Sequence, residues 1–163
     1  MSTEASDQPI VQRGLWFEEL EEGRRYVHSP GRTVGEADNT LFSTLTMNPQ
    51  SLHLDAVASA KTEFGERLVN SMFTLSTLVG LSVAQLTQGT TVANLGFNKI
   101  SFPKPVRIGD TLYAETVVVS KRPSKSRPDA GVVVFRHIAR NQHGEVVAEA
   151  ERVALMYREG ARP

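Results

Sequence analysis

Residues 71–86 read SMFTLSTLVGLSVAQL, and this stretch decides the fold. Its large apolar side chains recur at intervals of three and four residues, which is the spacing of one helix face. Most other positions carry small or hydroxylic side chains, and none of the residues is charged. A helix with so little charge is expected to be buried, with other elements packed closely around it. The sequence therefore predicts a long central helix from Ser71 to about Leu86.

The residues after Gly89 change to a pattern typical of strands. Residues 90–102 are rich in Val, Leu, Phe and Ile, and residues 111–121 alternate between inward and outward positions. Two further strands are expected at 132–141 and 146–157, because the turn sequence NQHG joins them. Strands that are segregated from helices in this way favour an α+β fold with an antiparallel sheet. A sheet wrapped around one long helix is the hot-dog fold, which we predict here.

The residues before the central helix predict shorter elements. A strand is expected over 25–28 and a helix over Ala37–Leu45. That helix should stop near Asn48, because the following proline disfavours helical geometry in the residue before it. A second short helix is expected over His53–Phe64, ended by Gly65.

The length of 163 residues suits a single domain. Residues 1–13 are small and polar without periodicity, so they predict a disordered leader. Residues 158–163 predict a similar tail. We expect one domain over residues 14–157, since no repeat or linker divides it.

The composition narrows the functional classes. Lys plus Arg and Asp plus Glu both total 18, so a nucleic acid is not expected as the main partner. No stretch approaches the roughly 18 uncharged apolar residues of a membrane span. The start of the chain lacks the apolar core of a signal peptide, so we expect a cytoplasmic protein.

The chain contains no cysteine, which excludes disulfides, thiolate nucleophiles and Cys-ligated metals. His28, His137 and His143 lack partners at ligand spacing, so we expect them to be solvated. We therefore expect neither a bound metal nor another resident cofactor.

Three motifs surround the predicted central helix. Residues 42–55 read FSTLTMNPQSLHLD, residues 62–72 read TEFGERLVNSM, and residues 102–112 read FPKPVRIGDTL. The first resembles the signature F-A-x-L-S-G-D-x-N-P-(L/I/V)-H-x-D of (R)-specific enoyl-CoA hydratases and MaoC-like dehydratases. The other two resemble T-x-F-G-x-x-(I/V)-(V/A)-H-G-M and F-x-x-P-V-x-x-G-D-T-L of the same family. The resemblance extends over about residues 14–157 and implies the hot-dog fold.

The register of the first motif implies roles for three residues. It places Asn48 at the family's catalytic Asp, Gln50 at its Asn and His53 at its catalytic His. The family's Asp and His flank a water that adds across the C2–C3 double bond of an enoyl thioester. An amide cannot accept a proton as a carboxylate does, so Asn48 is expected to orient the water. His53 is then the expected general acid and base, because histidine ordinarily titrates near neutral pH.

The resemblance also implies an oxyanion site at the start of the central helix. The backbone N–H groups of Ser71 and Met72 are expected to stabilise the enolate-like thioester oxygen, aided by the helix dipole. The Ser71 hydroxyl is a further candidate donor. Asn70 and Ser71 most simply cap the helix, and they can line the site as well. Asp55 is expected to be an N-cap.

Residues 42–55 and the loop KSRPD at 125–129 also resemble a MaoC-like branch acting on branched dicarboxylic enoyl-CoAs. Examples are itaconyl-CoA, mesaconyl-CoA and methylglutaconyl-CoA. In this interpretation Gln50, Asn70 and Arg127 bind substrate, and Arg127 grips a carboxylate or a CoA phosphate. The alternative for Arg127 is a loop without a binding role. CoA enters as part of the substrate thioester.

The family pairs two subunits into one continuous sheet with sites at the interface, so at least a homodimer is expected. Two alternatives to a hydratase stay open. A hot-dog thioesterase would need an acidic residue near the central helix; residues 70–85 contain none, although Glu63 and Glu66 lie just upstream. A CoA-thioester-binding subunit without catalysis is the other alternative, and the amide at Asn48 favours it.

Overall fold

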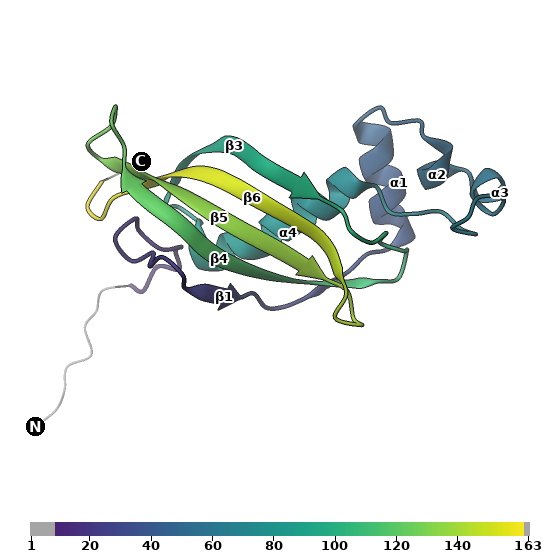
Figure 1. Ribbon diagram of the computed structural model, residues 1–163, viewed down its shortest axis with the longest axis horizontal. Coiled ribbons are helices and arrows are strands. Elements are labelled where there is room, and N and C mark those ends of the chain that lie inside the picture. Colours follow the sequence, from purple (N-terminus) through teal and green to yellow (C-terminus); the bar gives the residue numbers. More distant parts are fainter. Residues whose placement is uncertain (1–8, 162–163) are drawn as a thin grey trace, which may run out of the picture.

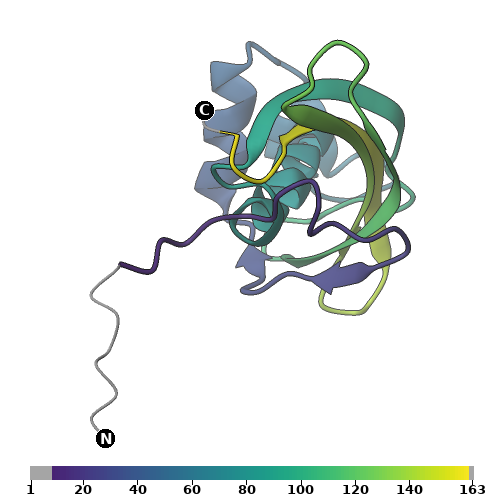
Figure 2. The same cartoon turned by 90° about the vertical axis from the view of Figure 1, so that its left-hand side faces the viewer.

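An antiparallel sheet wraps around one long helix (Figures 1 and 2). This computed structural model describes residues 9–161, so the first eight residues of the predicted leader and the last two of the predicted tail lie outside it. The elements are β1 (Arg25–Val27), β2 (Arg32–Thr33), α1 (Glu36–Leu45), α2 (Ser51–Leu54), α3 (Ala56–Ser59), α4 (Ser71–Leu86), β3 (Thr91–Ser101), β4 (Thr111–Pro123), β5 (Ala130–Arg140) and β6 (Val146–Tyr157).

The sheet has the strand order β1-β4-β5-β6-β3, and β2 pairs separately with β4. Each of these pairings is antiparallel. The predicted central helix is confirmed as α4, and the sheet curls around it (Figure 2). Helices α1, α2 and α3 gather beyond the N-terminal end of α4 (Figure 1). The α+β hot-dog fold expected from the sequence is therefore confirmed.

The predicted helix over His53–Phe64 is wrong, because the chain breaks at Asp55 into α2 and α3. Asp55 adopts an extended conformation with φ −104° and ψ 102°. Its carboxylate accepts hydrogen bonds from the N–H groups of Val57 and Ala58, both at 2.9 Å. Asp55 is thus the N-cap of α3, as the sequence predicts for this residue type.

The space between the sheet and α4 holds two hydrophobic clusters, one around Leu78 and one around Leu86. Polar side chains separate them. Strands β4, β5 and β6 each contribute one polar side chain. Two positions away along the strand, it has a member of the Leu78 cluster on one side and a member of the Leu86 cluster on the other. On α4, the polar residue lies four positions from each leucine. We call this set the polar layer, and it consists of Ser82, Thr116, His137 and Arg152.

The prediction that His28 and His137 are solvated is wrong. Their exposed fractions are 4% and 0%, because tertiary packing places both against the inner face of the sheet. Thr116 Oγ1 lies 2.7 Å from His28 Nε2 and 2.7 Å from His137 Nδ1. His28 Nδ1 lies 2.8 Å from Gln85 Oε1. His143, in the β5–β6 turn, is exposed as predicted.

Burial changes the acid–base behaviour of both inner histidines. Desolvation, followed by repulsion from Arg152 and His28, lowers the pKa of His137 to about 3. Desolvation also lowers the pKa of His28, although its hydrogen bond with Gln85 opposes the change. Both imidazoles are therefore neutral near pH 7.

The N-terminal segment joins the domain at Gly14, whose N–H donates to Gln88 O at 2.7 Å. At the other end, Arg158 Nε donates to Glu18 at 2.8 Å, within the segment predicted as a tail. Helices long and apolar enough to cross a membrane are not found in the described part of the chain.

Gly14→Ala is expected to destabilise the fold by about 1–3 kcal/mol, because a Cβ has no room there. It would lie 2.5 Å from Thr87 N and 2.6 Å from Leu86 O, which are backbone atoms. Gly80→Ala on α4 is the matched control, since no atom lies within 4 Å of its Cβ position. We expect that control to stabilise the helix by roughly 0.5–1 kcal/mol. Urea unfolding measures both, and equal stability of Gly14→Ala and wild type would contradict the close approach.

Acid is expected to destabilise the protein through His137. The unfolded chain protonates this group near its ordinary pKa of 6.5, whereas the folded protein keeps it neutral down to about pH 3. The unfolded state therefore binds more protons in this window, and the free energy of unfolding falls as the pH decreases through it. The full effect is about 1.4 kcal/mol per pH unit.

Unfolding titrations between about pH 7 and pH 5 test this linkage, because few carboxyl groups titrate there. His137→Asn should show a shallower loss of stability than wild type, and His143→Asn should show the wild-type slope. Parallel slopes for all three proteins would rule out the contribution of His137.

Candidate functional site

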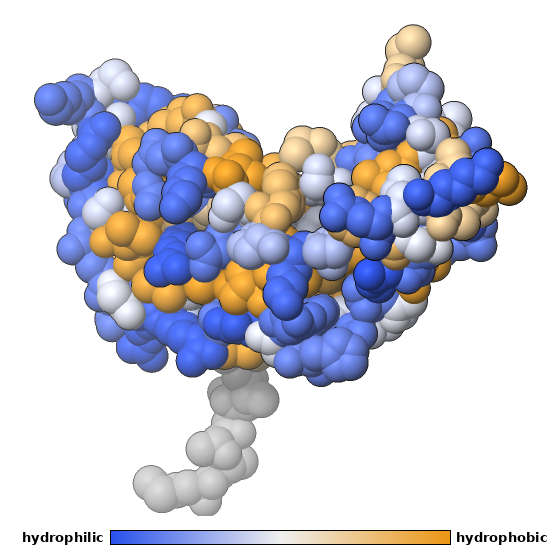
Figure 3. All heavy atoms as spheres, turned by 45° about the vertical axis from the view of Figure 1, so that its right-hand side comes forward, coloured by the Kyte–Doolittle hydropathy of each residue, from blue (hydrophilic) through white to orange (hydrophobic). Residues whose placement is uncertain are grey.

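A pocket of about 190 Å³ opens at the N-terminal end of α4. All three sequence motifs contribute to its wall. His53 comes from the first, Ser71 from the second, and Phe102 from the third, while Thr74 adds the next turn of the helix. The space-filling view of this side of the molecule shows a hollow between two raised parts, with hydrophobic side chains in and below it (Figure 3).

His53 is half-buried at the end of α2, and its ring is held by one hydrogen bond. Nδ1 lies 3.0 Å from the carbonyl oxygen of Leu68. A carbonyl only accepts, so Nδ1 carries the hydrogen and Nε2 of the neutral ring has a free lone pair. The pocket therefore contains an oriented imidazole that can take a proton from a bound water.

Asn39 on α1 positions this histidine, and the sequence interpretation missed it. The side chain is fully buried. Its Nδ2 donates to His53 O at 3.0 Å and to Leu68 O at 3.2 Å, while its Oδ1 accepts from Asn70 N at 2.9 Å. One amide thus joins α2, the segment before α4 and the start of α4. The sequence offered no signal for this role, because the spacing of Ala37, Leu41 and Leu45 predicted a different inner face. The structure exposes those three residues and buries Asn39 and Ser43 instead.

The start of α4 differs in one respect from the expectation. Asn70 is the N-cap, as predicted, because its Oδ1 accepts from the N–H of Met72 at 2.9 Å. The Met72 N–H is therefore occupied and does not fit the expected role of an open oxyanion donor. The Met72 side chain is exposed and lies outside the pocket wall. Ser71 lines the pocket and is the residue of this pair that can donate to a ligand.

Asn48 and Gln50 lie on the loop between α1 and α2, outside the pocket wall. Met47 precedes them with φ 55°, a left-handed conformation that turns the chain sharply. Asn48 is half-buried, and its Oδ1 accepts from Gln50 N at 3.1 Å. Gln50 is exposed beside Ser51. The loop thus carries both residues near His53 in the chain without placing them in this pocket.

Arg127 belongs to the loop between β4 and β5, and this loop lies at the opposite end of the sheet from α2 (Figure 1). It donates to Asp129 through Nε at 3.1 Å and Nη2 at 2.6 Å. Its guanidinium also lies 5.7 Å from the centre of the Tyr157 ring. The structure does not bring Arg127 and His53 together within one subunit.

Carboxylates are absent from the pocket wall. Glu63 is exposed, and Glu66 forms an ion pair with Arg107 on the surface. Within residues 9–161, no group of three His, Asp or Glu side chains is arranged to hold a metal ion. The ionisable side chains in this wall are His53 and Lys104. Lys104 donates to Glu145 at 2.8 Å, so the His53 imidazole is the group in the wall that can accept a proton.

The chain is similar in sequence to one protein family and to several characterised proteins. A family model described as a MaoC like domain matches residues 18–141. Protein MaoC of Klebsiella aerogenes is 36% identical over 97 residues, which cover 60% of this chain and 28% of that protein. A mesaconyl-CoA hydratase of Haloarcula marismortui is 26% identical over 148 residues, covering 90% of this chain and 41% of that protein. The chain thus spans less than half the length of these two relatives.

One shorter relative and two solved structures each match at least 86% of this chain. An (R)-specific enoyl-CoA hydratase of Rhodospirillum rubrum is 28% identical and covers 86% of this chain and 91% of that protein. The MaoC-like dehydratase structure from Rhodospirillum rubrum gives a TM-score of 0.79 at 30% identity, covering 91% and 100% of the two chains. A MaoC domain protein from Chloroflexus aurantiacus gives 0.86 at 25% identity, covering 96% of this chain and 45% of that one.

Asn39→Ala is expected to lower the free energy of unfolding by about 2–4 kcal/mol, because it leaves the buried Asn70 N–H unpaired and removes the Asn39 donor from the carbonyls of His53 and Leu68. The Asn70 amide should also exchange its hydrogen faster, since it loses its acceptor. Asn98→Ala on β3 is the control, because Asn98 is exposed and bonds only to Glu151. Its cost should stay within about 0.5 kcal/mol. Equal stability of the two variants would show that Asn39 does not hold the site.

Proposed function

Because the chain belongs to the MaoC-like domain family, we propose that it adds water reversibly to the C2–C3 double bond of an enoyl-CoA thioester. The observation that carries this proposal is the His53 ring in the pocket at the start of α4. Its Nδ1–H is bound to Leu68 O, so Nε2 is the proton acceptor, and Ser71 lies in the same wall.

The proposed reaction uses these groups in sequence. His53 Nε2 takes a proton from water while the water oxygen bonds to C3 of the thioester. Electron density moves to the thioester oxygen, where the Ser71 N–H and hydroxyl stabilise it at the positive end of the α4 dipole. The protonated His53 then delivers its proton to C2, which completes the addition. One positioned acid and base of this kind contributes roughly 10²–10⁴ in rate.

Asn48 is proposed to orient the water from the α1–α2 loop. Its amide can donate and accept hydrogen bonds, but it cannot move a proton as a carboxylate does. The loop would have to place the side chain over the pocket when substrate binds, because Asn48 lies outside the wall here. Gln50, next on the same loop, is proposed to contact the acyl group.

We propose a short, branched dicarboxylic enoyl-CoA as the substrate class. The sequence of residues 42–55 supports this choice through its resemblance to that branch of the family. The names of relatives agree, since they include mesaconyl-CoA hydratases and a beta-methylmalyl-CoA dehydratase at 26–29% identity.

A homodimer is proposed as the working form. The pocket of about 190 Å³ is smaller than the roughly 300–1,000 Å³ typical of ligand sites. Strand β3 ends the strand order, so one edge of the sheet is unpaired in a single chain. Exposed apolar side chains, including Leu95, Ile100 and Phe102, lie on and beside this strand. A role for Arg127 in this site would require the second subunit.

A thioesterase is the less favoured alternative. Hydrolysis of a hot-dog-bound thioester usually relies on an acidic residue, and the pocket wall contains none. Glu66, the nearest candidate in the second motif, is paired with Arg107.

A panel of enoyl-CoAs tests these alternatives when double-bond absorbance and free thiol are followed separately. Loss of absorbance without thiol release is the expected result. Thiol release would instead identify a thioesterase, and binding of the CoA ester without either change would identify a non-catalytic subunit.

His53→Ala should lower kcat for hydration by about 10²–10⁴-fold, because it removes the proton acceptor. His143→Ala should retain wild-type kcat, since His143 is exposed in the β5–β6 turn. Activity of His53→Ala close to that of wild type would refute the site assignment.

A further inference from the structure

Arg152 on β6 is a buried cation without a visible counter-charge. Its side chain belongs to the polar layer, and the residue is 4% exposed. Within residues 9–161, Nε and Nη1 of Arg152 have no hydrogen-bond partner, and neither does Nε2 of His137. Arginine stays ionised in proteins, so it cannot escape the cost of burial by losing a proton. An unpaired buried charge of this kind normally points to a missing partner.

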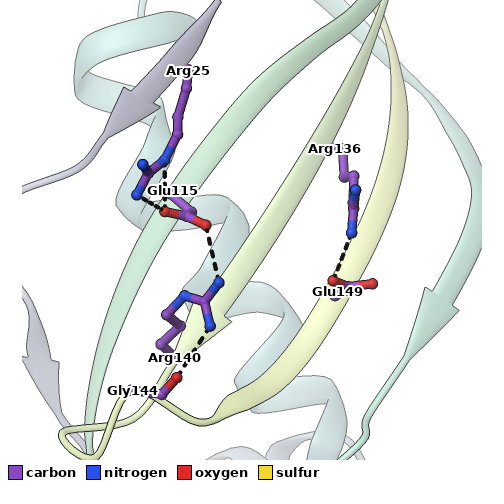
Figure 4. Close-up of polar contacts among 6 residues, drawn as sticks. All are labelled: Arg25, Glu115, Arg136, Arg140, Gly144 and Glu149. Carbon is purple, nitrogen blue, oxygen red and sulfur yellow. Dashed lines mark hydrogen bonds and ion pairs between the residues drawn. The ribbon is translucent and has the colours of Figure 1, made fainter.

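On the outer face of the same sheet, by contrast, arginines form ion pairs with glutamates (Figure 4). Arg136 on β5 donates to Glu149 on β6 at 2.9 Å. Two further arginines, from β1 and β5, flank one glutamate of β4. Glu149 and Glu151 alternate with the inward positions of β6, so they face away from Arg152. The outer pairs are Arg136–Glu149, Arg25–Glu115 and Arg140–Glu115.

Neighbouring elements cannot supply the counter-charge. Residues 71–86 of α4 contain no charged side chain, and residues 91–101 of β3 contain no Asp or Glu. A second copy that covered this flank with its own α4 or β3 would therefore bring no carboxylate. The other ionisable groups in and beside the polar layer are His137 and His28, which are both bases.

We propose that Arg152, beside His137, binds a carboxylate anion within the polar layer. Guanidinium and carboxylate groups form short charge-assisted hydrogen bonds, which are strongest where water is excluded. The two flanking hydrophobic clusters provide such surroundings.

Helix α4 connects this site to the pocket. Thr74 lines the pocket and Ser82 belongs to the polar layer, eight residues or roughly 12 Å further along the helix. A short dicarboxylic acyl group is much shorter than this separation, so its distal carboxylate cannot reach Arg152 while the thioester occupies the pocket. The anion proposed here is therefore a free small carboxylate, such as acetate or succinate.

Thermal unfolding of the full chain tests the site without any assay of activity. Acetate and succinate should raise the Tm of wild type, and chloride at matched ionic strength should not. Arg152→Met should lose this stabilisation. Arg136→Met is the matched control, because it removes an arginine of the same sheet whose outer face already provides a partner. Failure of both carboxylates to raise the wild-type Tm, or an equal effect of chloride, would overturn binding of a free carboxylate.

Hydration kinetics separate this site from the pocket. Arg152→Met and Arg136→Met should both keep the wild-type preference between mesaconyl-CoA and crotonyl-CoA, measured as the ratio of the two kcat/KM values. A loss of that preference in Arg152→Met alone, together with no carboxylate-dependent change in Tm, would overturn the proposal.

The two proposals fail separately. If wild type hydrates neither thioester, the proposed function fails, and the Tm series still decides whether Arg152 binds a carboxylate. If Arg152→Met does not fold, Arg152→Lys replaces it, because lysine keeps the charge but loses the planar pair of donors. Arg152→Lys should weaken carboxylate stabilisation, and full retention in this variant would count against a guanidinium site.

Discussion

The burial of α4 constrains every other element of this protein. This helix carries no charged side chain, and one of its faces, which includes Leu75, Leu78 and Leu86, is buried. The sheet covers this face by curling around the helix axis, and α1–α3 close over its N-terminal end (Figure 1). The position of the pocket follows from this arrangement, because the first turn of α4 is where the three motif segments meet.

Two buried polar side chains, Asn39 and Arg152, differ in how many of their polar atoms form hydrogen bonds. Asn39 has a partner for each of its polar atoms, and its hydrogen bonds tie His53 and Asn70 to one another. Such a satisfied group makes the surrounding backbone rigid. Arg152 is buried to a similar degree with Nε and Nη1 unpaired within residues 9–161. The first arrangement supports the position of His53, and the second is the observation on which the proposed carboxylate site rests.

Several features could be predicted from local pattern alone. The helix α4, the β5–β6 hairpin and the caps Asp55 and Asn70 depend on residues close together in the chain, and these predictions are confirmed. The helix over His53–Phe64 was predicted wrongly, because the side chain of Asp55 ends one helical turn and caps the next. The Met72 N–H, which was predicted to be an oxyanion donor, bonds to the side chain of the Asn70 cap.

The fold class could be predicted from the chain alone because it rests on the periodicity of one helix and several strands, and the family because three motifs resemble those of its members. The role of His53 stays a prediction. The burial of particular polar groups could be learned only from the folded structure. His28, Asn39, His137 and Arg152 acquire their environments from strands and helices far away in the chain. Their partners are set by strand register and by the path of α4 beneath the sheet, and neither is encoded in the residues next to them.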